Sequence, residues 1–186
     1  MRILIADDES IIRMGMKSML QELGHQVIAA TNGREALQMA RTQRPDMAIL
    51  DIRMPYTDGL QAAKVLSEKH PMPIVMLTAF SEQDLIDKAT DLPIQGYLVK
   101  PIKPEELRAS ISLAQKRFGE AQALQTKAAK LEKALAERKL IDRAKGKLMK
   151  TGLDEEEAYR MIQQHARNNR QTMPQAAVAI LKWATP

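Results

Sequence analysis

The chain of 186 residues contains no cysteine, and only 3% of its residues are aromatic. The lack of cysteine excludes disulfides, thiolate zinc sites and cysteine nucleophiles, and it is compatible with a reducing cytoplasm. No apolar run approaches the roughly 18–20 residues that are needed to span a bilayer, and the first residues lack the pattern of a secretory signal. We therefore expect a cytoplasmic protein without a membrane partner, whose core is built mostly from Ile, Leu, Val, Ala and Met.

Charged residues are distributed unevenly along the chain. Residues 1–118 hold 15 Lys/Arg and 15 Asp/Glu, whereas residues 119–186 hold 13 and 8. The whole net charge of +5 therefore lies in the last third of the chain. A basic segment attached to a neutral one indicates a polyanionic partner for that segment. A solvated, lysine-rich helix face is the alternative explanation.

Short apolar runs alternate with amphipathic segments in the first two-thirds of the chain. The apolar runs predict strands at 3–6, 27–30, 47–50, 74–77 and 97–99. Helical patterns lie near 11–23, 34–41, 60–69 and 84–90, and a further helix begins at Pro104. This alternation predicts a parallel sheet with helices on both faces. Residues 1–118 therefore fit an α/β fold of the flavodoxin-like, doubly wound type with five strands.

The segment 119–136 has the composition of a long linking helix. Apolar residues recur with the 3-4 spacing of a coiled-coil seam over about two heptads: Ala121, Leu124, Ala128, Leu131 and Leu135. We expect this helix to link two domains and to pair with a second copy of the chain. Packing of the seam against its own domain is the alternative.

Residues 137–186 predict a small all-α module of three helices. Gly152 has the position of a helix C-cap. Asp154 is a candidate N-cap for the next helix, which has three acids in its first turn. A loop is expected at 167–170, and a last helix begins at Pro174. Such a small module has little core of its own.

Charged and hydroxyl side chains follow four of the expected strands. Asp7 and Asp8 follow the first strand and Asp51 the third, while Thr78 and Lys100 follow the fourth and fifth. The carboxyl ends of parallel strands meet at one crevice of the sheet. Clustered carboxylates bind Mg²⁺, and an aspartate can form an aspartyl-phosphate. The sequence therefore predicts a phosphorylatable aspartate beside a magnesium site.

These residues closely resemble the signature of the receiver domain of two-component response regulators. The matching positions are Asp7-Asp8, Asp51-x-x-Met54-Pro55-x-x-x-Gly59, Thr78-Ala79 and Lys100-Pro101. The resemblance implies that Asp51 accepts a phosphoryl group from a cognate histidine kinase. The only chemistry implied is phosphorylation of the chain itself and its reversal, so we expect no free-standing enzyme.

The same resemblance implies roles for the residues around Asp51. Asp8, Asp51 and the main-chain carbonyl of Arg53 would bind Mg²⁺, with Asp7 acting through water. Lys100 would hold the phosphoryl group. Thr78 and Tyr97 would form a switch pair, the hydroxyl moving toward the phosphoryl group as the aromatic ring turns inward. Arg53 and Phe80 lie where the family tunes dephosphorylation.

The segment 143–149, Arg-Ala-Lys-Gly-Lys-Leu-Met, with Glu157-Ala158-Tyr159 and Ala176-Ala177 further on, is similar to the ANTAR output domain. This resemblance implies a three-helix module that binds paired hairpin loops in nascent RNA and prevents transcription termination. Small residues would allow close helix packing: Ala144, Gly146, Ala158 and Ala177. Candidate RNA contacts are Arg143, Lys145, Arg167 and Arg170.

Together these features predict a phosphorylation-controlled antiterminator. Phosphorylation of Asp51 would favour a homodimer, and each partner would supply one RNA-binding module. Two alternatives stay open: a signalling regulator whose tail binds a protein, and one whose tail binds DNA. RNA binding should weaken steeply with salt, which distinguishes it from protein binding.

Overall fold

The computed structural model describes residues 1–79 and 92–183. Contacts between residues divide the chain into two compact units, Met1–Gln122 and Ala123–Pro186. The helix expected near 84–90 lies outside the described residues, and so does Phe80. Within the described part of the chain, no helix is both long enough and apolar enough to cross a membrane.

The first unit contains a five-stranded sheet. Its strands are β1 (Arg2–Ala6), β2 (Gln26–Ala30), β3 (Met47–Asp51), β4 (Ile74–Thr78) and β5 (Gly96–Val99). All neighbours pair in parallel, in the order β2-β1-β3-β4-β5. The expected flavodoxin-like topology is therefore confirmed.

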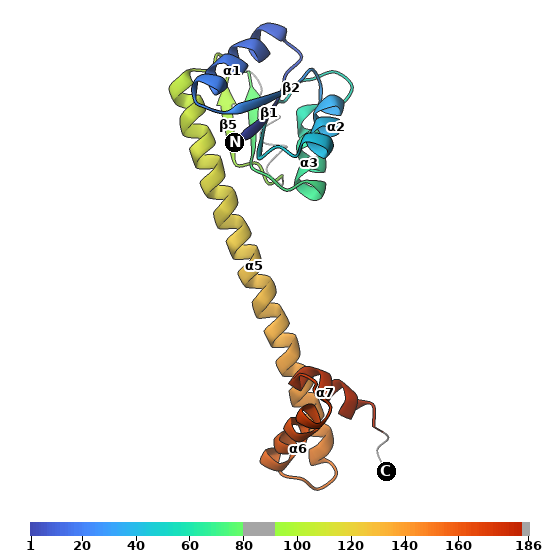
Figure 1. The fold of residues 1–186 in the computed structure, drawn as a ribbon. Coiled ribbons are helices and arrows are strands. Elements are labelled where there is room, and N and C mark those ends of the chain that lie inside the picture. The colour runs from blue at the N-terminus through green and yellow to red at the C-terminus, as the bar shows by residue number, and fades with distance from the viewer. Residues whose placement is uncertain (80–91, 184–186) are drawn as a thin grey trace. The chain divides into compact units, whose positions relative to one another are not determined.

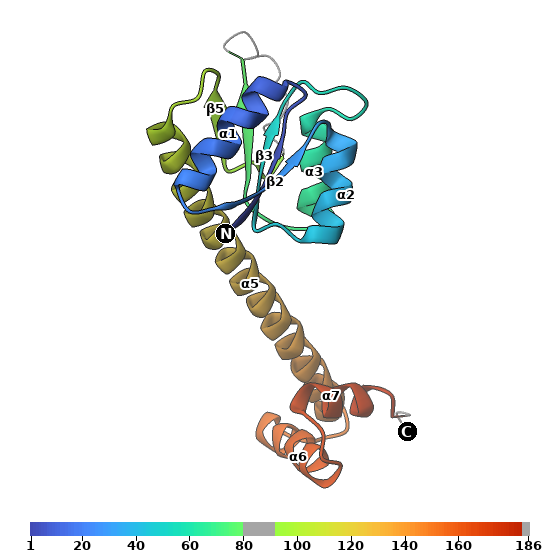
Figure 2. The same cartoon turned by 45° about the horizontal axis from the view of Figure 1, so that its top comes forward.

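Helices cover both faces of this sheet. The first three are α1 (Ser10–Glu22), α2 (Gly33–Gln43) and α3 (Gly59–Lys69). Figures 1 and 2 show α2 and α3 side by side on one face, with α1 on the other. Alternate residues of each strand point to opposite faces, so Leu50 packs with the α2–α3 side and Ile49 with the α1 side. The sheet is buried on both faces, as the near-continuous apolar strands require.

The next described helix, α5 (Pro104–Met149), runs without interruption through the segment expected to link two domains. Leu107, Ile111 and Ala114 bury their side chains on the α1 side of the sheet. Leu124 and Leu131, in contrast, are 68% and 63% exposed. The apolar seam is therefore not covered within its own unit, and its pairing with a second copy stays a prediction.

The second unit adds α6 (Glu155–Asn168) and α7 (Met173–Leu181) to the end of α5. Asp154 and Glu157 form a capping box at the start of α6, which satisfies two backbone donors there. Gly152 has a φ of 98°, as expected after a helix end. The α6 helix continues to Asn168, so the loop expected at 167–170 begins about half a turn later than the sequence indicated.

Alanine dominates the core of the second unit. Its buried residues are Ala144, Leu148, Ala158, Ile162, Ala166, Ala176, Ala177 and Ile180. Small side chains let α5, α6 and α7 approach closely, as expected for Ala144, Ala158 and Ala177. The packing role expected of Gly146 is wrong, because this residue is exposed and a Cβ there would have nothing within 4 Å.

Candidate functional site

Three carboxylates meet at the carboxyl edge of the sheet. Asp51 is the last residue of β3, and Asp7 and Asp8 follow β1, its neighbour in the sheet. One carboxylate oxygen from each of these residues lies within 4.8 Å of the other two. Asp7 and Asp51 are buried, while Asp8 is exposed. The parallel topology thus gathers acids that are more than forty positions apart in the sequence.

Lys100, at the end of β5, supplies a positive charge to this cluster. Its Nζ lies 2.8 Å from Asp7 Oδ2 and 3.1 Å from Asp51 Oδ1. Desolvation of Lys100 disfavours the ammonium, but the hydrogen bonds and charges of the two aspartates outweigh it and raise the pKa of Lys100. Lys100 is therefore a fixed cation at neutral pH, next to the carboxylate that would be modified.

The exposed Glu9 side chain also lies near Lys100, with Oε1 3.4 Å from the ammonium. We did not expect this residue from the sequence. Its place directly after Asp7-Asp8 could have indicated it, because an acidic run after a strand extends over the same crevice.

The donor set of the cluster fits Mg²⁺. Three carboxylates and one ammonium leave two excess negative charges, which a divalent cation would neutralise. Asp7 Oδ2 is buried, and its partner within the described residues is the Lys100 ammonium alone. Carboxylate and carbonyl oxygens with water are the ligands that Mg²⁺ prefers. Asp7, Asp8 and Asp51 are therefore suitable ligands for this ion.

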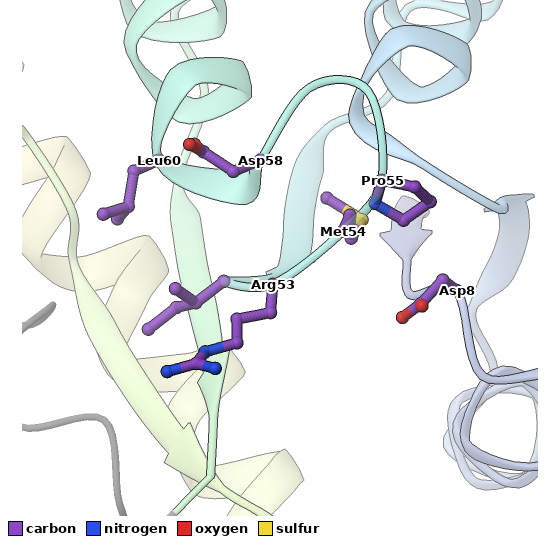
Figure 3. A pocket seen from close by; sticks show the side chains of 7 residues that line it. Asp8, Arg53, Met54, Pro55, Asp58 and Leu60 are labelled. Atoms are coloured by element: carbon purple, nitrogen blue, oxygen red, sulfur yellow. The ribbon is translucent and has the colours of Figure 1, made fainter.

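A cavity of about 430 Å³ opens beside Asp8. Figure 3 shows its lining, which comes from Asp8 after β1 and from the loop between β3 and α3, including Arg53, Met54 and Pro55. Arg53 thus lies on the same cavity as Asp8, where the sequence predicted its carbonyl to be a metal ligand. The cavity gives a small reactant access from solvent to this edge of the sheet.

Gly59 explains the fixed spacing between Asp51 and the start of α3. Its amide donates to the Ile52 carbonyl at 2.9 Å, and a Cβ at Gly59 would lie only 1.9 Å from the Asp51 carbonyl oxygen. No other residue fits this close approach. Asp58 then caps α3 by accepting from the Gln61 amide at 2.7 Å. The loop after Asp51 is therefore closed against β3 by backbone contacts.

Thr78 lies on β4, which pairs with β3, and Tyr97 lies on β5, one strand further along the sheet. Thr78 is buried at the end of β4, and its hydroxyl donates to the Ala79 carbonyl at 3.0 Å. Tyr97 in β5 pairs with Met76 of β4 and is half-buried against the α2–α3 side of the core. Partial burial raises the pKa of the Tyr97 phenol. The ring is thus partly buried and partly exposed to solvent.

The basic candidates of the second unit fall into two groups. Arg143, Arg167 and Arg170 are exposed and have no ion pair within the described residues. Lys145 Nζ, in contrast, lies 2.7 Å from Glu155 Oε1 and 3.1 Å from Asp142 Oδ1. Hydrogen bonds to these two carboxylates raise the pKa of Lys145. Lys145 therefore joins α5 to the start of α6.

Comparisons with known proteins agree with this arrangement. The family model of the response regulator receiver domain matches residues 3–112, and that of the ANTAR domain matches residues 129–181. The chain belongs to the response regulators. It combines an N-terminal receiver domain with a C-terminal ANTAR domain, and so joins a signal-receiving unit to an RNA-binding output.

Individual relatives support this assignment. The chain is 43% identical over 183 residues to the transcriptional regulatory protein PdtaR of Mycobacterium tuberculosis, covering 97% of this chain and 89% of that protein. The receiver domain of AraT from Geobacillus stearothermophilus is 34% identical with a TM-score of 0.58. It corresponds to 65% of this chain and 97% of that one. A receiver domain protein from Clostridium thermocellum is 28% identical with a TM-score of 0.59, covering 62% and 94%.

Proposed function

We propose that a histidine kinase phosphorylates Asp51 and that this modification controls an RNA-binding output that antagonises transcription termination. The observation that carries the proposal is the cluster itself. Asp51 ends β3 within 4.8 Å of two further carboxylates and 3.1 Å from the Lys100 ammonium. An acid that served only as a turn or helix cap would not need two further acids and a largely buried lysine around it.

The chemistry follows from the residues present. An Asp51 carboxylate oxygen attacks the phosphorus of a phosphohistidine in line. The new P–O bond forms as the P–N bond breaks, and the leaving imidazole nitrogen keeps the electron pair of that bond and takes up a proton from water. Lys100 stays protonated, because its pKa is raised, and its ammonium binds an oxygen of the transferred group. Asp7, Asp8, Asp51 and the Arg53 carbonyl would hold Mg²⁺. When bound, this ion neutralises charge on the phosphoryl oxygens.

The proposed response passes through Thr78 and Tyr97. A phosphoryl group on Asp51 offers new acceptors to the Thr78 hydroxyl, which now donates to the Ala79 carbonyl. Movement of this hydroxyl leaves room for the half-buried Tyr97 ring to turn further inward. Burial of the ring on the α2–α3 side changes the surface of β5, and this surface is then available for pairing.

Pairing would be completed by the seam on α5. Leu124, Leu131 and Leu135 are exposed at coiled-coil spacing, and covering them with a second copy removes apolar area from water. A homodimer would present two RNA-binding modules to two hairpins at once. The second contact then becomes intramolecular, which raises the affinity for a paired target.

The exposed arginines are the proposed RNA contacts of each module. Arg143, Arg167 and Arg170 are free to form bidentate hydrogen bonds with phosphate. Lys145 remains a candidate as predicted, but its ammonium would first have to leave Glu155 and Asp142. We therefore expect the three arginines to contribute more to RNA binding than Lys145.

The experiment combines phosphorylation with RNA binding. Full-length protein is treated with acetyl phosphate and Mg²⁺, or with beryllofluoride, and titrated with an RNA of two hairpins while its mass is followed by light scattering. We expect dimerisation and tighter RNA binding, both absent in Asp51→Asn but retained in Glu68→Gln, an exposed acid on α3. Unchanged mass and affinity in the treated wild type would contradict the coupling.

Two controls address the alternative partners. Affinity for hairpin RNA should fall steeply with salt if phosphate contacts dominate. A competing DNA duplex should displace the RNA only weakly. Efficient competition by DNA would favour a tail that binds DNA. A tail partner whose binding is insensitive to salt would favour a tail that binds a protein.

A further inference from the structure

Trp183 is the only tryptophan of the chain, and it lies just after the end of α7. The residue is 43% exposed, although an indole is among the side chains that gain most from burial. It also lies two positions beyond the segment that matches the ANTAR model, which ends at residue 181. The family pattern therefore does not account for it.

Three anchors hold the Trp183 side chain and backbone in place. Its amide donates to the Ile180 carbonyl at 3.1 Å. Its own carbonyl accepts from the Lys147 ammonium, which also donates to the Leu181 carbonyl at 3.1 Å. Its ring meets the His165 ring edge to face, with centroids 5.3 Å apart and an interplanar angle of 79°. An exposed aromatic residue is thus fixed between α5, α6 and α7.

The edge-to-face contact covers at most one face of the indole. If the His165 edge points at the indole, it covers one face only; if the indole edge points at His165, it covers neither. In both cases at least one face is free of His165, in agreement with the exposure of the residue. A ring already fixed in one orientation loses little entropy when a second ring stacks on it.

The surroundings of this face are basic. Lys147 directs its ammonium at two carbonyls and has no acidic partner within the described residues. The exposed Lys182 precedes the tryptophan and has no ion pair there either. An aromatic face beside ammonium groups that no carboxylate neutralises within the described residues is the arrangement that binds single-stranded nucleic acid, in which bases stack and phosphates meet cations.

We propose that the Trp183 indole is a stacking platform for an unpaired base of the bound RNA, with Lys147 and Lys182 next to the adjoining phosphates. This inference rests on the RNA-binding function proposed above and adds a subsite to it. A second protein copy is a poorer occupant. One indole offers at most about 250 Å², far below the roughly 800 Å² per partner of a stable protein interface.

The single tryptophan makes the test specific, because all indole emission comes from this site. Full-length protein is titrated with an RNA of two hairpins that have unpaired loops, and in parallel with a blunt duplex of the same stems. We expect the hairpin RNA to quench the emission saturably and the duplex to leave it nearly unchanged.

Variants separate stacking from a structural role. Trp183→Leu should weaken hairpin binding by about 5- to 150-fold, the range that corresponds to stacking of one base on an aromatic ring. Its salt dependence should stay unchanged, since no charge is lost. Trp183→Phe should keep most of the affinity, because it retains a π-face. The matched control is Val178→Ala, which shortens another partly exposed apolar residue of α7 and should bind as the wild type does.

Each other outcome overturns the inference. Hairpin binding without quenching and with normal affinity in Trp183→Leu would remove the subsite but leave the RNA-binding function intact. No hairpin binding by any variant, the wild type included, would remove both. A changed oligomeric state with unchanged RNA affinity would assign the indole to a contact between copies. If Trp183→Leu melts at a lower temperature than the wild type, or if Trp183→Phe also loses RNA binding, the role of Trp183 is structural.

Discussion

Two stretches of the helix α5 carry apolar residues at similar spacing but in opposite environments. Leu107 and Ile111, near its start, are buried against the receiver sheet. Leu124 and Leu131, about five turns further on, are mostly exposed. The first stretch completes a core that exists within one chain, whereas the second has no partner within the described residues.

This difference in burial suggests that the first stretch of α5 stabilises the fold of one chain and that the second stretch serves assembly with another molecule. Removing an apolar side chain from the first stretch should damage the receiver itself. Removing one from the second should leave a single chain intact and affect only what covers the seam. The same helix would then serve stability at one end and a regulated contact in the middle, and substitutions in the two stretches can show whether this is so.

The largest effect is expected for Leu107→Ala. Truncation of a fully buried leucine leaves a cavity and costs about 2–5 kcal/mol, and Leu107 has an exposed fraction of 0%. Urea unfolding followed by circular dichroism should show a receiver transition at clearly lower denaturant. Trp183 emission, which reports on the second unit, should change much less.

The control for Leu107→Ala is Leu113→Ala on the same helix. Leu113 is about half exposed, so its truncation removes little buried area and should cost well under the value for Leu107. Equal losses for the two variants would contradict a receiver core that extends onto α5.

A smaller effect on stability, but a clear one on assembly, is expected for Leu131→Glu. The side chain is exposed in the single chain, so the free energy of unfolding should change little. A carboxylate at a seam position would be desolvated and unpaired in the dimer, and pairing after beryllofluoride treatment should weaken by about tenfold or more. Analytical ultracentrifugation over a range of concentrations measures the dimer dissociation constant of the wild type and of the variant.

Lys133→Gln is the matched control for Leu131→Glu. It changes the net charge by the same amount but lies two positions further on, at a site that does not belong to the seam. Its pairing should equal that of the wild type. If both variants weaken pairing alike, charge rather than the apolar seam determines the dimer.

Much of the receiver could be predicted because the sequence patterns that define its strands and helices span only a few neighbouring residues. Apolar runs set the five strands to within one residue at each end, and parallel topology alone brings Asp7, Asp8 and Asp51 to one edge. Partners across the fold were harder to predict. The ion pair between Lys145 and Glu155 depends on how α6 turns back along α5, and no spacing in the sequence indicates that turn.

The remaining differences concern helix ends and contacts between helices. Polar residues at 167–170 predicted a loop, but the capping box and the apolar stripe of α6 carry the helix on to Asn168. The His165–Trp183 contact could not be predicted either, since it joins two helices whose packing was unknown. The helix expected to begin at Pro104 and the linking helix expected at 119–136 are one helix, α5.

The smallest effect is expected for Gly119→Ala, at the boundary between the two stretches of α5. Glycine in a helix interior costs roughly 0.5–1 kcal/mol relative to alanine, and a Cβ at Gly119 would meet nothing within 4 Å. Thermal unfolding followed by circular dichroism should therefore show a slightly more stable chain. Gly59→Ala should have the opposite sign, because its Cβ would collide with the Asp51 carbonyl. A loss of stability in Gly119→Ala would instead mean that α5 needs the freedom of glycine at this point, and that its buried and exposed stretches are not one continuous helix in solution.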